Sequence, residues 1–134
     1  DKHVTLYSVG YKDKSLLYIG NCVDIGEYAH ITAINEIRIG DNVLIGKNVT
    51  ITDNSHGEIC CDNLNIPPKE RIMFSSGAVL IGENVWLGDK VTILPNVSIG
   101  KNSIIGANSV VTKNIPDNVV AAGNPAKVIK HIIS

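Results

Sequence analysis

Aromatic side chains are scarce in this chain of 134 residues, at 4% against 44% for all hydrophobic residues, with one Trp and one Phe. A core of this composition must be built from Ile, Val, Leu and Ala, which argues against the aromatic-rich interior of a β-sandwich. It suits a narrow interior of stacked aliphatic rows. The length allows one domain with a sizeable core and leaves no room for a second.

A surplus of charge is also lacking, because 12 Lys and Arg residues balance 13 Asp and Glu residues, for a formal net charge of −1. Such a chain has no field to recruit nucleic acid or an anionic membrane surface, and neither partner is expected. The sequence has no apolar run of about 18 residues and no signal-peptide pattern, so no membrane insertion is expected. The abrupt start at Asp1 leaves open whether an N-terminal segment is missing.

Cysteine is limited to Cys22, Cys60 and Cys61, an odd number that cannot pair completely. A disulfide between the adjacent Cys60 and Cys61 would be strained, and the three residues lack metal-ligand spacing. We interpret them as reduced thiols in a cytoplasmic protein, and we expect no metal requirement.

What the sequence does contain is a period of six residues. Large aliphatic residues recur at every sixth position, and Gly follows four of them: Ile81, Leu87, Ile93, Ile99, Ile105 and Val111. Helices repeat at three to four residues and half-buried strands at two, so a period of six indicates a short strand followed by a corner. This hexapeptide repeat predicts an all-β fold, a parallel β-helix in which each unit buries its apolar side by stacking on the coil below.

The residues between the aliphatic positions agree with this pattern. A second inward candidate lies two residues earlier, as at Val85, Val91 and Val97, which places both side chains on one face of a strand. Gly and Asn fill the corners, as in Gly82-Glu83-Asn84 and Gly100-Lys101-Asn102. These residues tolerate the left-handed backbone that a sharp corner needs.

The repeat divides the chain into five segments. An irregular N-terminal cap is expected at 1–18, coils at 19–56 and 79–122, a loop at 57–78 and a tail at 123–134. The register shifts by two residues near Asn35-Glu36, which predicts a bulged corner. The repeat resumes at Ile81 in the phase of Ile51, so the loop is expected to project from an uninterrupted prism. In the tail, Pro125 is placed to open a short C-terminal helix over the end of the stack.

Three segments carry a resemblance to a known family: Asp53-x-x-His56, IGENVWLGDKVTILPNVSIG at 81–100 and IGANSVVTKNIPDNVVAAGNPAKVIK at 105–130. They resemble the hexapeptide-repeat acyltransferases, in particular the galactoside, maltose and O-antigen type of sugar O-acetyltransferase. The resemblance implies a left-handed β-helix with three faces, assembled as a homotrimer with active sites between subunits. It also implies transfer of an acetyl group from acetyl-CoA to a hydroxyl of a sugar or a surface-polysaccharide precursor.

Acetyl transfer from a thioester to a hydroxyl needs a base for the hydroxyl proton, and an imidazole can serve as base and then as acid. His56 lies where the repeat breaks, in a segment with no core to fill. The resemblance places the catalytic histidine there, acting as general base for direct attack on the thioester. A polar corner residue is the alternative interpretation of His56.

The other candidate residues fall into two groups. The supporting or acceptor-binding candidates are Asp53, Asn54, Asn35, Glu70 and Trp86, and the resemblance assigns coenzyme A binding to Asp89, Ala107, Thr112, Lys113, Lys127 and Lys130. Asp53, Glu70 or a backbone carbonyl would orient His56. A subunit interface is the alternative for Trp86, and a solvated face is the alternative for Lys127 and Lys130. His30, interpreted as a solvated corner residue, is expected to have no catalytic part, as are His3 and His131.

Other functions stay open at this stage. A catalytically silent β-helix would serve as a scaffold or binding module, and a hexapeptide-repeat N-acyltransferase would use the same prism. A zinc carbonic anhydrase would need three converging imidazoles, whereas His30 and His56 stand alone in the repeat region. The acceptor sugar, its reacting hydroxyl and the acyl chain length are not determined by the sequence.

Overall fold

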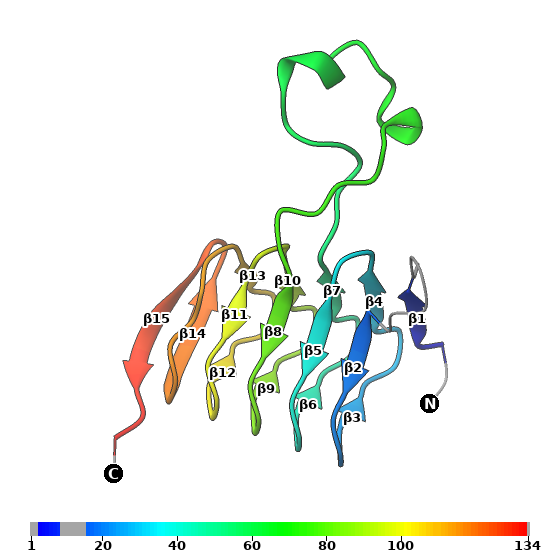
Figure 1. The fold of residues 1–134 in the computed structure, drawn as a ribbon. Coiled ribbons are helices and arrows are strands. Elements are labelled where there is room, and N and C mark those ends of the chain that lie inside the picture. The colour runs from blue at the N-terminus through cyan, green and yellow to red at the C-terminus, as the bar shows by residue number, and fades with distance from the viewer. Residues whose placement is uncertain (1–2, 9–15, 134) are drawn as a thin grey trace.

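The computed structural model describes residues 3–8 and 16–133, so the cap expected at 1–18 lies partly outside the described residues. Its strands form three sheets that enclose one interior (Figure 1). Face A consists of β1 (Thr5–Ser8), β4 (His30–Ala33), β7 (Thr50–Thr52), β10 (Thr92–Ile93) and β13 (Val110–Val111). Face B consists of β2 (Leu17–Ile19), β5 (Ile37–Ile39), β8 (Val79–Ile81) and β11 (Ser98–Ile99). Face C consists of β3 (Asp24–Ile25), β6 (Leu44–Ile45), β9 (Trp86–Leu87), β12 (Ile104–Ile105), β14 (Val119–Gly123) and β15 (Ala126–His131).

The chain visits the faces in the order B, C, A, and each turn of this cycle stacks on the one before it. The pairs along the stack are parallel, as between β4 and β7 or β6 and β9, and the two termini lie at opposite ends (Figure 1). The predicted parallel β-helix is therefore confirmed.

Aliphatic rows fill the interior as the period of six predicts. On face A, Ile31, Ile51, Ile93 and Val111 are aligned by the strand register, and each is 0% exposed. Each side chain stacks on the equivalent side chain of the next coil, so each rung gains its burial from its neighbours.

The corners are made by Asn as well as Gly. Asn84, Asn102 and Asn118 stack at the corner between faces B and C, and all three have positive φ, from 56° to 63°. Asn84 Nδ2 donates to Asn102 Oδ1 (3.2 Å), and Asn102 Nδ2 donates to Asn118 Oδ1 (2.9 Å). Asn thus combines a tolerated left-handed backbone with a hydrogen bond to the next coil.

The strand register confirms the shift near Asn35-Glu36. Trp86 lies beside Ile104, 18 positions on, whereas Asp24 lies beside Leu44, 20 positions on. Leu44 in turn lies beside Trp86, across the whole loop. The sheets therefore continue past the loop, which leaves the stack between β7 and β8 and carries two short 3-10 helices, η1 (Cys61–Asn63) and η2 (Pro68–Glu70) (Figure 1).

The predicted C-terminal helix is wrong, because residues 126–131 form strand β15, antiparallel to β14. Gly123 pairs with Ala126, so Asn124 and Pro125 make a two-residue hairpin turn and Pro125 does not open a helix. Val128 and Ile129 favour extended backbone. A strand here also satisfies the backbone groups that the outer edge of β14 would otherwise expose, which a helix could not do.

The described residues include no helix with the length and apolarity needed to cross a bilayer. Cys22, Cys60 and Cys61 are free and exposed.

Replacing Ile93 by Ala tests the interior row on face A. Ile93 lies between Ile51 and Val111 and is fully buried, so the cavity left behind is expected to lower the free energy of unfolding by about 2–5 kcal/mol. The measurement is equilibrium denaturation followed by circular dichroism. Thr92→Ala, an outward change on the same strand, is the matched control and should cost less than about 1 kcal/mol. Equal losses would contradict the row.

Candidate functional site

His56 lies where the loop leaves the corner between faces A and B. Its exposed side chain lines two cavities of about 480 Å³ each. One, the face-A cavity, lies against outward side chains of face A and includes Thr32, Thr52 and Met73. The other, the loop cavity, is lined by residues of the loop and its base, including Cys61 and Arg71. The imidazole thus stands between the prism and the loop, open to a ligand on either side.

The backbone around His56 is fixed by a narrow neck at the base of the loop. Ser55 and Phe74 exchange backbone hydrogen bonds across it, at 2.8 and 3.0 Å. Gly57 follows His56 with φ +91°, and a Cβ there would lie 2.9 Å from Cβ and Cδ of Arg71. Only Gly meets both the conformational and the spatial demand.

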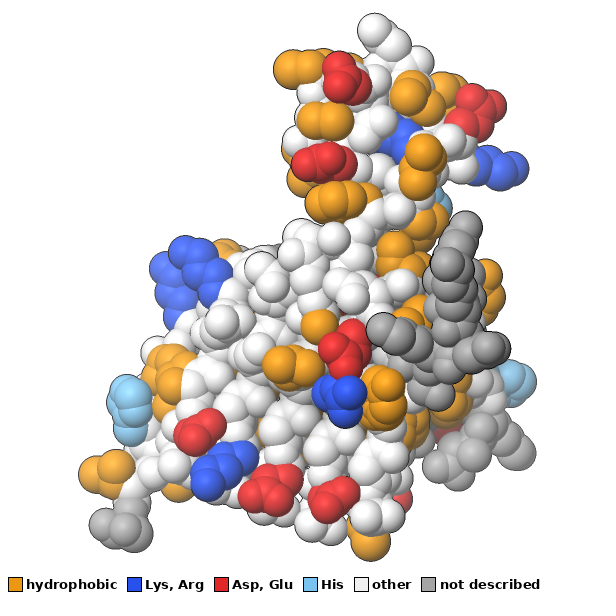
Figure 2. Space-filling model, viewed as in Figure 1, with side chains coloured by type: hydrophobic (Ala, Val, Ile, Leu, Met, Phe, Trp, Pro, Cys, Tyr) orange, Lys and Arg blue, Asp and Glu red, His pale blue; other side chains and the backbone are white. Residues whose placement is uncertain are grey.

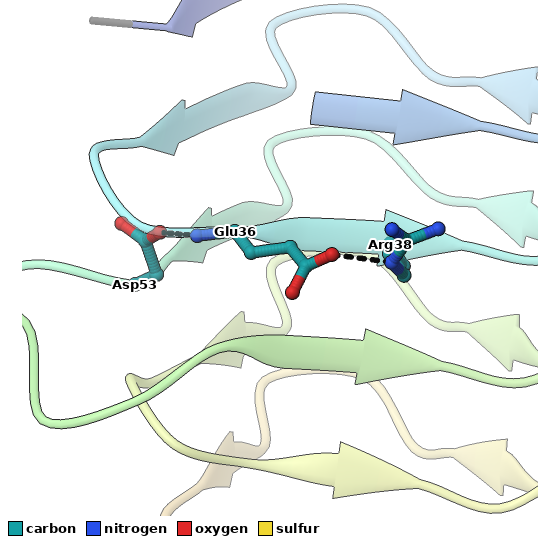
Figure 3. A network of polar contacts seen from close by, with 3 residues as sticks. All are labelled: Glu36, Arg38 and Asp53. Carbon is teal, nitrogen blue, oxygen red and sulfur yellow. Dashed lines mark hydrogen bonds and ion pairs between the residues drawn. The ribbon is translucent and has the colours of Figure 1, made fainter. Parts of the chain in front are cut away.

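Asp53 anchors the preceding corner. Its side chain is 0% exposed, and its carboxylate accepts the backbone N–H groups of Ile34 (2.9 Å), Asn35 (2.7 Å) and Glu36 (2.7 Å). Figure 3 shows the bond to Glu36, whose side chain pairs with Arg38. A buried carboxylate is tolerated when several donors solvate it, and here they close the corner that holds the two extra residues. No hydrogen bond in the described part of the chain joins Asp53 to His56.

Of the three other supporting candidates, Asn54 lines a cavity of His56, whereas Asn35 and Glu70 do not. Asn54 lines the face-A cavity, and its Nδ2 donates to the Thr32 carbonyl (3.1 Å). Asn35 donates through Nδ2 to Ser75 Oγ (3.3 Å) and is not among the residues lining either His56 cavity. Glu70 lies in η2 on the loop, exposed, and lines neither cavity.

Trp86 lies on a different face of the prism from His56. It is outward on β9 of face C, 50% exposed, between Leu44 and Ile104. The predicted outward position is confirmed. The prism itself separates Trp86 from the two cavities of His56, so a single chain does not bring the two residues into one cleft.

Two coenzyme A candidates, Asp89 and Ala107, lie along the corner between faces C and A, at the opposite edge of face A from His56. Asp89 Oδ1 accepts the Lys47 backbone N–H (2.9 Å). A Cβ at Gly88 would lie 2.7 Å from the Ala107 nitrogen, so successive coils are in tight contact there. We call this corner the ledge; it also carries the exposed side chains of Lys47 and Lys90.

The remaining coenzyme A candidates lie at the C-terminal end of the stack. Lys127 and Lys130 are exposed on β15, where they pair with Ala122 and Val120 of β14. Thr112 and Lys113 are exposed after β13, and Thr112 shares a further cavity of about 560 Å³ with Asn54. The three lysines therefore supply positive charge at one end of the prism.

The expected corner position of His30 is wrong. His30 begins strand β4 and is not a corner residue, and its side chain lines the face-A cavity together with His56. The pattern His30-Ile31-Thr32, followed one coil later by Thr50-Ile51-Thr52, was the available signal, since both segments alternate outward and inward positions. The described residues contain no group of three or more His, Cys, Asp or Glu able to hold a metal ion.

Comparisons with known proteins agree with this architecture. The sequence model "Bacterial transferase hexapeptide (six repeats)" matches residues 78–113, and "Hexapeptide repeat of succinyl-transferase" matches residues 36–57. WbbJ of Escherichia coli (strain K12), provisionally named a lipopolysaccharide biosynthesis O-acetyl transferase, is 44% identical over 121 residues, or 87% of this chain and 61% of WbbJ.

Two solved structures share the fold. A maltose O-acetyltransferase from Clostridium difficile 630 is 35% identical with a TM-score of 0.75, covering 99% of this chain and 67% of its own. A galactoside acetyltransferase in complex with coenzyme A is 38% identical with a TM-score of 0.80, covering 98% of this chain and 64% of its own.

The fold and the site together define a class of protein, a β-helix of hexapeptide coils with a histidine at the base of a projecting loop. The chain belongs to the hexapeptide-repeat acyltransferase family, and its fold is the left-handed parallel β-helix that the resemblance implied. It spans 61% of the length of WbbJ and 56% of the length of a galactoside O-acetyltransferase from Escherichia coli (strain K12).

Replacing Asp53 by Asn tests the anchored corner. One of the two carboxylate oxygens becomes an NH2 group that faces backbone donors, so we expect the free energy of unfolding to fall by about 1–3 kcal/mol. Thermal and denaturant unfolding measure the loss. Asp117→Asn is the matched control, because Asp117 is exposed and accepts one backbone N–H, from Lys101 at 3.0 Å. A loss no larger than that of the control would contradict the role of Asp53.

Proposed function

We propose that this chain is the catalytic domain of an acetyl-CoA-dependent O-acetyltransferase that modifies a sugar hydroxyl, with His56 as general base. The observation that carries the proposal is the position of His56, at the interruption of the prism and on the wall of two cavities. The relatives support it by name, as galactoside and maltose acetyltransferases, and one of their structures contains coenzyme A. The exposed imidazole between two cavities also favours an enzyme over a silent scaffold.

His56 carries the proton through the reaction. Its imidazole takes the proton of the acceptor hydroxyl as the hydroxyl oxygen bonds to the thioester carbonyl carbon. When the carbon–sulfur bond breaks, His56 returns that proton to the leaving sulfur, and the acetyl group remains on the sugar. Each step balances without a metal or a second catalytic group from the protein. The acceptor hydroxyl is placed in the face-A cavity, whose lining is rich in hydroxyl groups.

The chain's surface fits an extended thioester with phosphates at one end. At the ledge, Gly88 and the exposed Ala107 place no long side chain over the backbone, which leaves room for a pantetheine arm. Lys113, Lys127 and Lys130 lie exposed at the C-terminal end, where they would neutralise the phosphates. Coenzyme A bound along this ledge supplies the acetyl group as a reactive thioester.

We further propose a homotrimer in which the active site lies between subunits. His56 lies at one edge of face A and Asp89 at the other, with Trp86 on face C, so one chain holds only part of the site. Exposed apolar side chains support packing between copies. Leu44, Leu80 and Trp86 are 41–50% exposed on the prism, and Ile59, Leu64 and Ile72 are 74–101% exposed on the projecting loop seen in Figure 2.

The His56→Ala variant tests the general base. Thiol release from acetyl-CoA, measured with a panel of maltose, methyl β-galactoside and other sugars, should fall at least about a hundredfold. Coenzyme A affinity should stay unchanged, since His56 is not a phosphate or ledge residue. The control is His131→Ala on β15, which should keep the full rate. An unchanged rate in His56→Ala would remove His56 from the mechanism.

The double variant Lys127→Ala/Lys130→Ala tests the phosphate end of the ledge. Isothermal titration with coenzyme A should show Kd raised by about tenfold or more, as expected for the loss of charge-assisted contacts. Lys101→Ala, at the exposed corner between faces B and C, is the matched control and should bind normally. If the double variant binds as tightly as the unmodified chain, these lysines form a solvated face.

A further inference from the structure

We propose that His30 is a second acceptor-contacting imidazole, and that His30 and His56 together select an uncharged sugar in the face-A cavity. This inference rests on the proposed function, because it assigns the acceptor to the same cavity. It concerns a residue that the sequence pattern presented only as a surface histidine.

The strand register fixes His30 at the wall of the cavity. His30 lies beside Thr50 on the next coil, and its backbone N–H donates to the Val49 carbonyl at 2.8 Å. One alternation further, Thr32 and Thr52 lie side by side, with 3.1 Å between their hydroxyl oxygens. The ring of His30 is exposed, and none of the hydrogen bonds among the described residues involves it. The backbone of His30 is therefore fixed by the sheet, and its ring nitrogens are available for a hydrogen bond to a ligand.

The chemistry of the cavity wall favours a polyol over an anion. Among the described residues that line it there is no Lys, Arg, Asp or Glu. The polar groups that line it are hydroxyls, one amide and the two imidazoles, including Thr50, Asn54 and Ser55. Tyr7 of β1 and Met73 of the loop provide apolar surface for the faces of a sugar ring. Such a wall offers hydrogen bonds to hydroxyl groups and no fixed cation to a phosphate.

The two histidines would contact different hydroxyl groups of the same sugar. His56, at the base of the loop, reaches the hydroxyl that reacts, whereas His30, on β4, holds a second hydroxyl of the same sugar. A sugar gripped at two hydroxyl groups presents one of them to the thioester in a fixed direction, which gives specificity for the position that is acetylated. His30 is therefore a specificity-determining residue and not a second base.

The test separates sugar binding from thioester binding. With the sugar that turns over fastest in the thiol-release assay, His30→Ala should raise the KM for that sugar about tenfold while the KM for acetyl-CoA stays unchanged. His30→Asn, which keeps a hydrogen-bonding group, should restore part of the affinity. Thr92→Ala is the matched control, since Thr92 lies next to Thr50 in the same outward column but is outside the cavity lining. An unchanged sugar KM in His30→Ala would overturn the inference and leave His56 and the proposed function intact.

A binding measurement decides the inference without turnover. The ring C–H signals of His30, identified by their loss in His30→Asn, should shift on addition of methyl β-galactoside or maltose in NMR spectra of the wild-type chain.

The outcomes of the two experiments are distinguishable. No turnover with any sugar of the panel would contradict the proposed function, and the absence of a His30 shift with every sugar would contradict the inference. Faster turnover of galactose 6-phosphate than of methyl β-galactoside would overturn the assignment to uncharged sugars.

Discussion

No rung of this prism can bury its apolar side alone, and every other feature of the structure follows from that constraint. Ile51 is covered only because Ile31 and Ile93 lie directly on either side of it in neighbouring coils. The stack must therefore keep its register on all three faces at once. A change of chain length can be absorbed only at a corner, where no inward side chain has to meet a neighbour.

The corner between faces A and B takes up these changes in length. It holds the two extra residues at 34–36 and the whole loop between β7 and β8, while the strands on either side stay aligned. Asp53 stabilises the insertion at 34–36, because its buried carboxylate accepts hydrogen bonds from three backbone N–H groups that the regular strand pairing leaves unpaired. The backbone at this corner is free of the stacking requirement, and His56 lies there, between β7 and β8.

A prism with flat faces cannot enclose a ligand by itself, and this explains why the candidate groups are spread over two edges and two faces. His56 and Asp89 border opposite edges of face A, and Trp86 is on face C. Deep clefts require concave surface, which a convex stack gains only from a projecting loop or a second copy. The loop contributes to both cavities of His56, and in the proposed trimer a second copy supplies the rest of the site.

The sequence by itself determined the period, the inward rows, the outward position of Trp86 and the place where the coils are interrupted, because these depend on spacing along the chain. It misassigned residues 126–131, since a strand there depends on the free edge of β14, which exists only once the stack is built. The three donors to Asp53 come from 17 to 19 residues earlier, and His30 meets His56 in one cavity only through the stacking of β4 on β7. Contacts between coils were decided by the tertiary structure alone. A repeat indicates which side chains face inward, but it does not indicate which residues of other coils they meet.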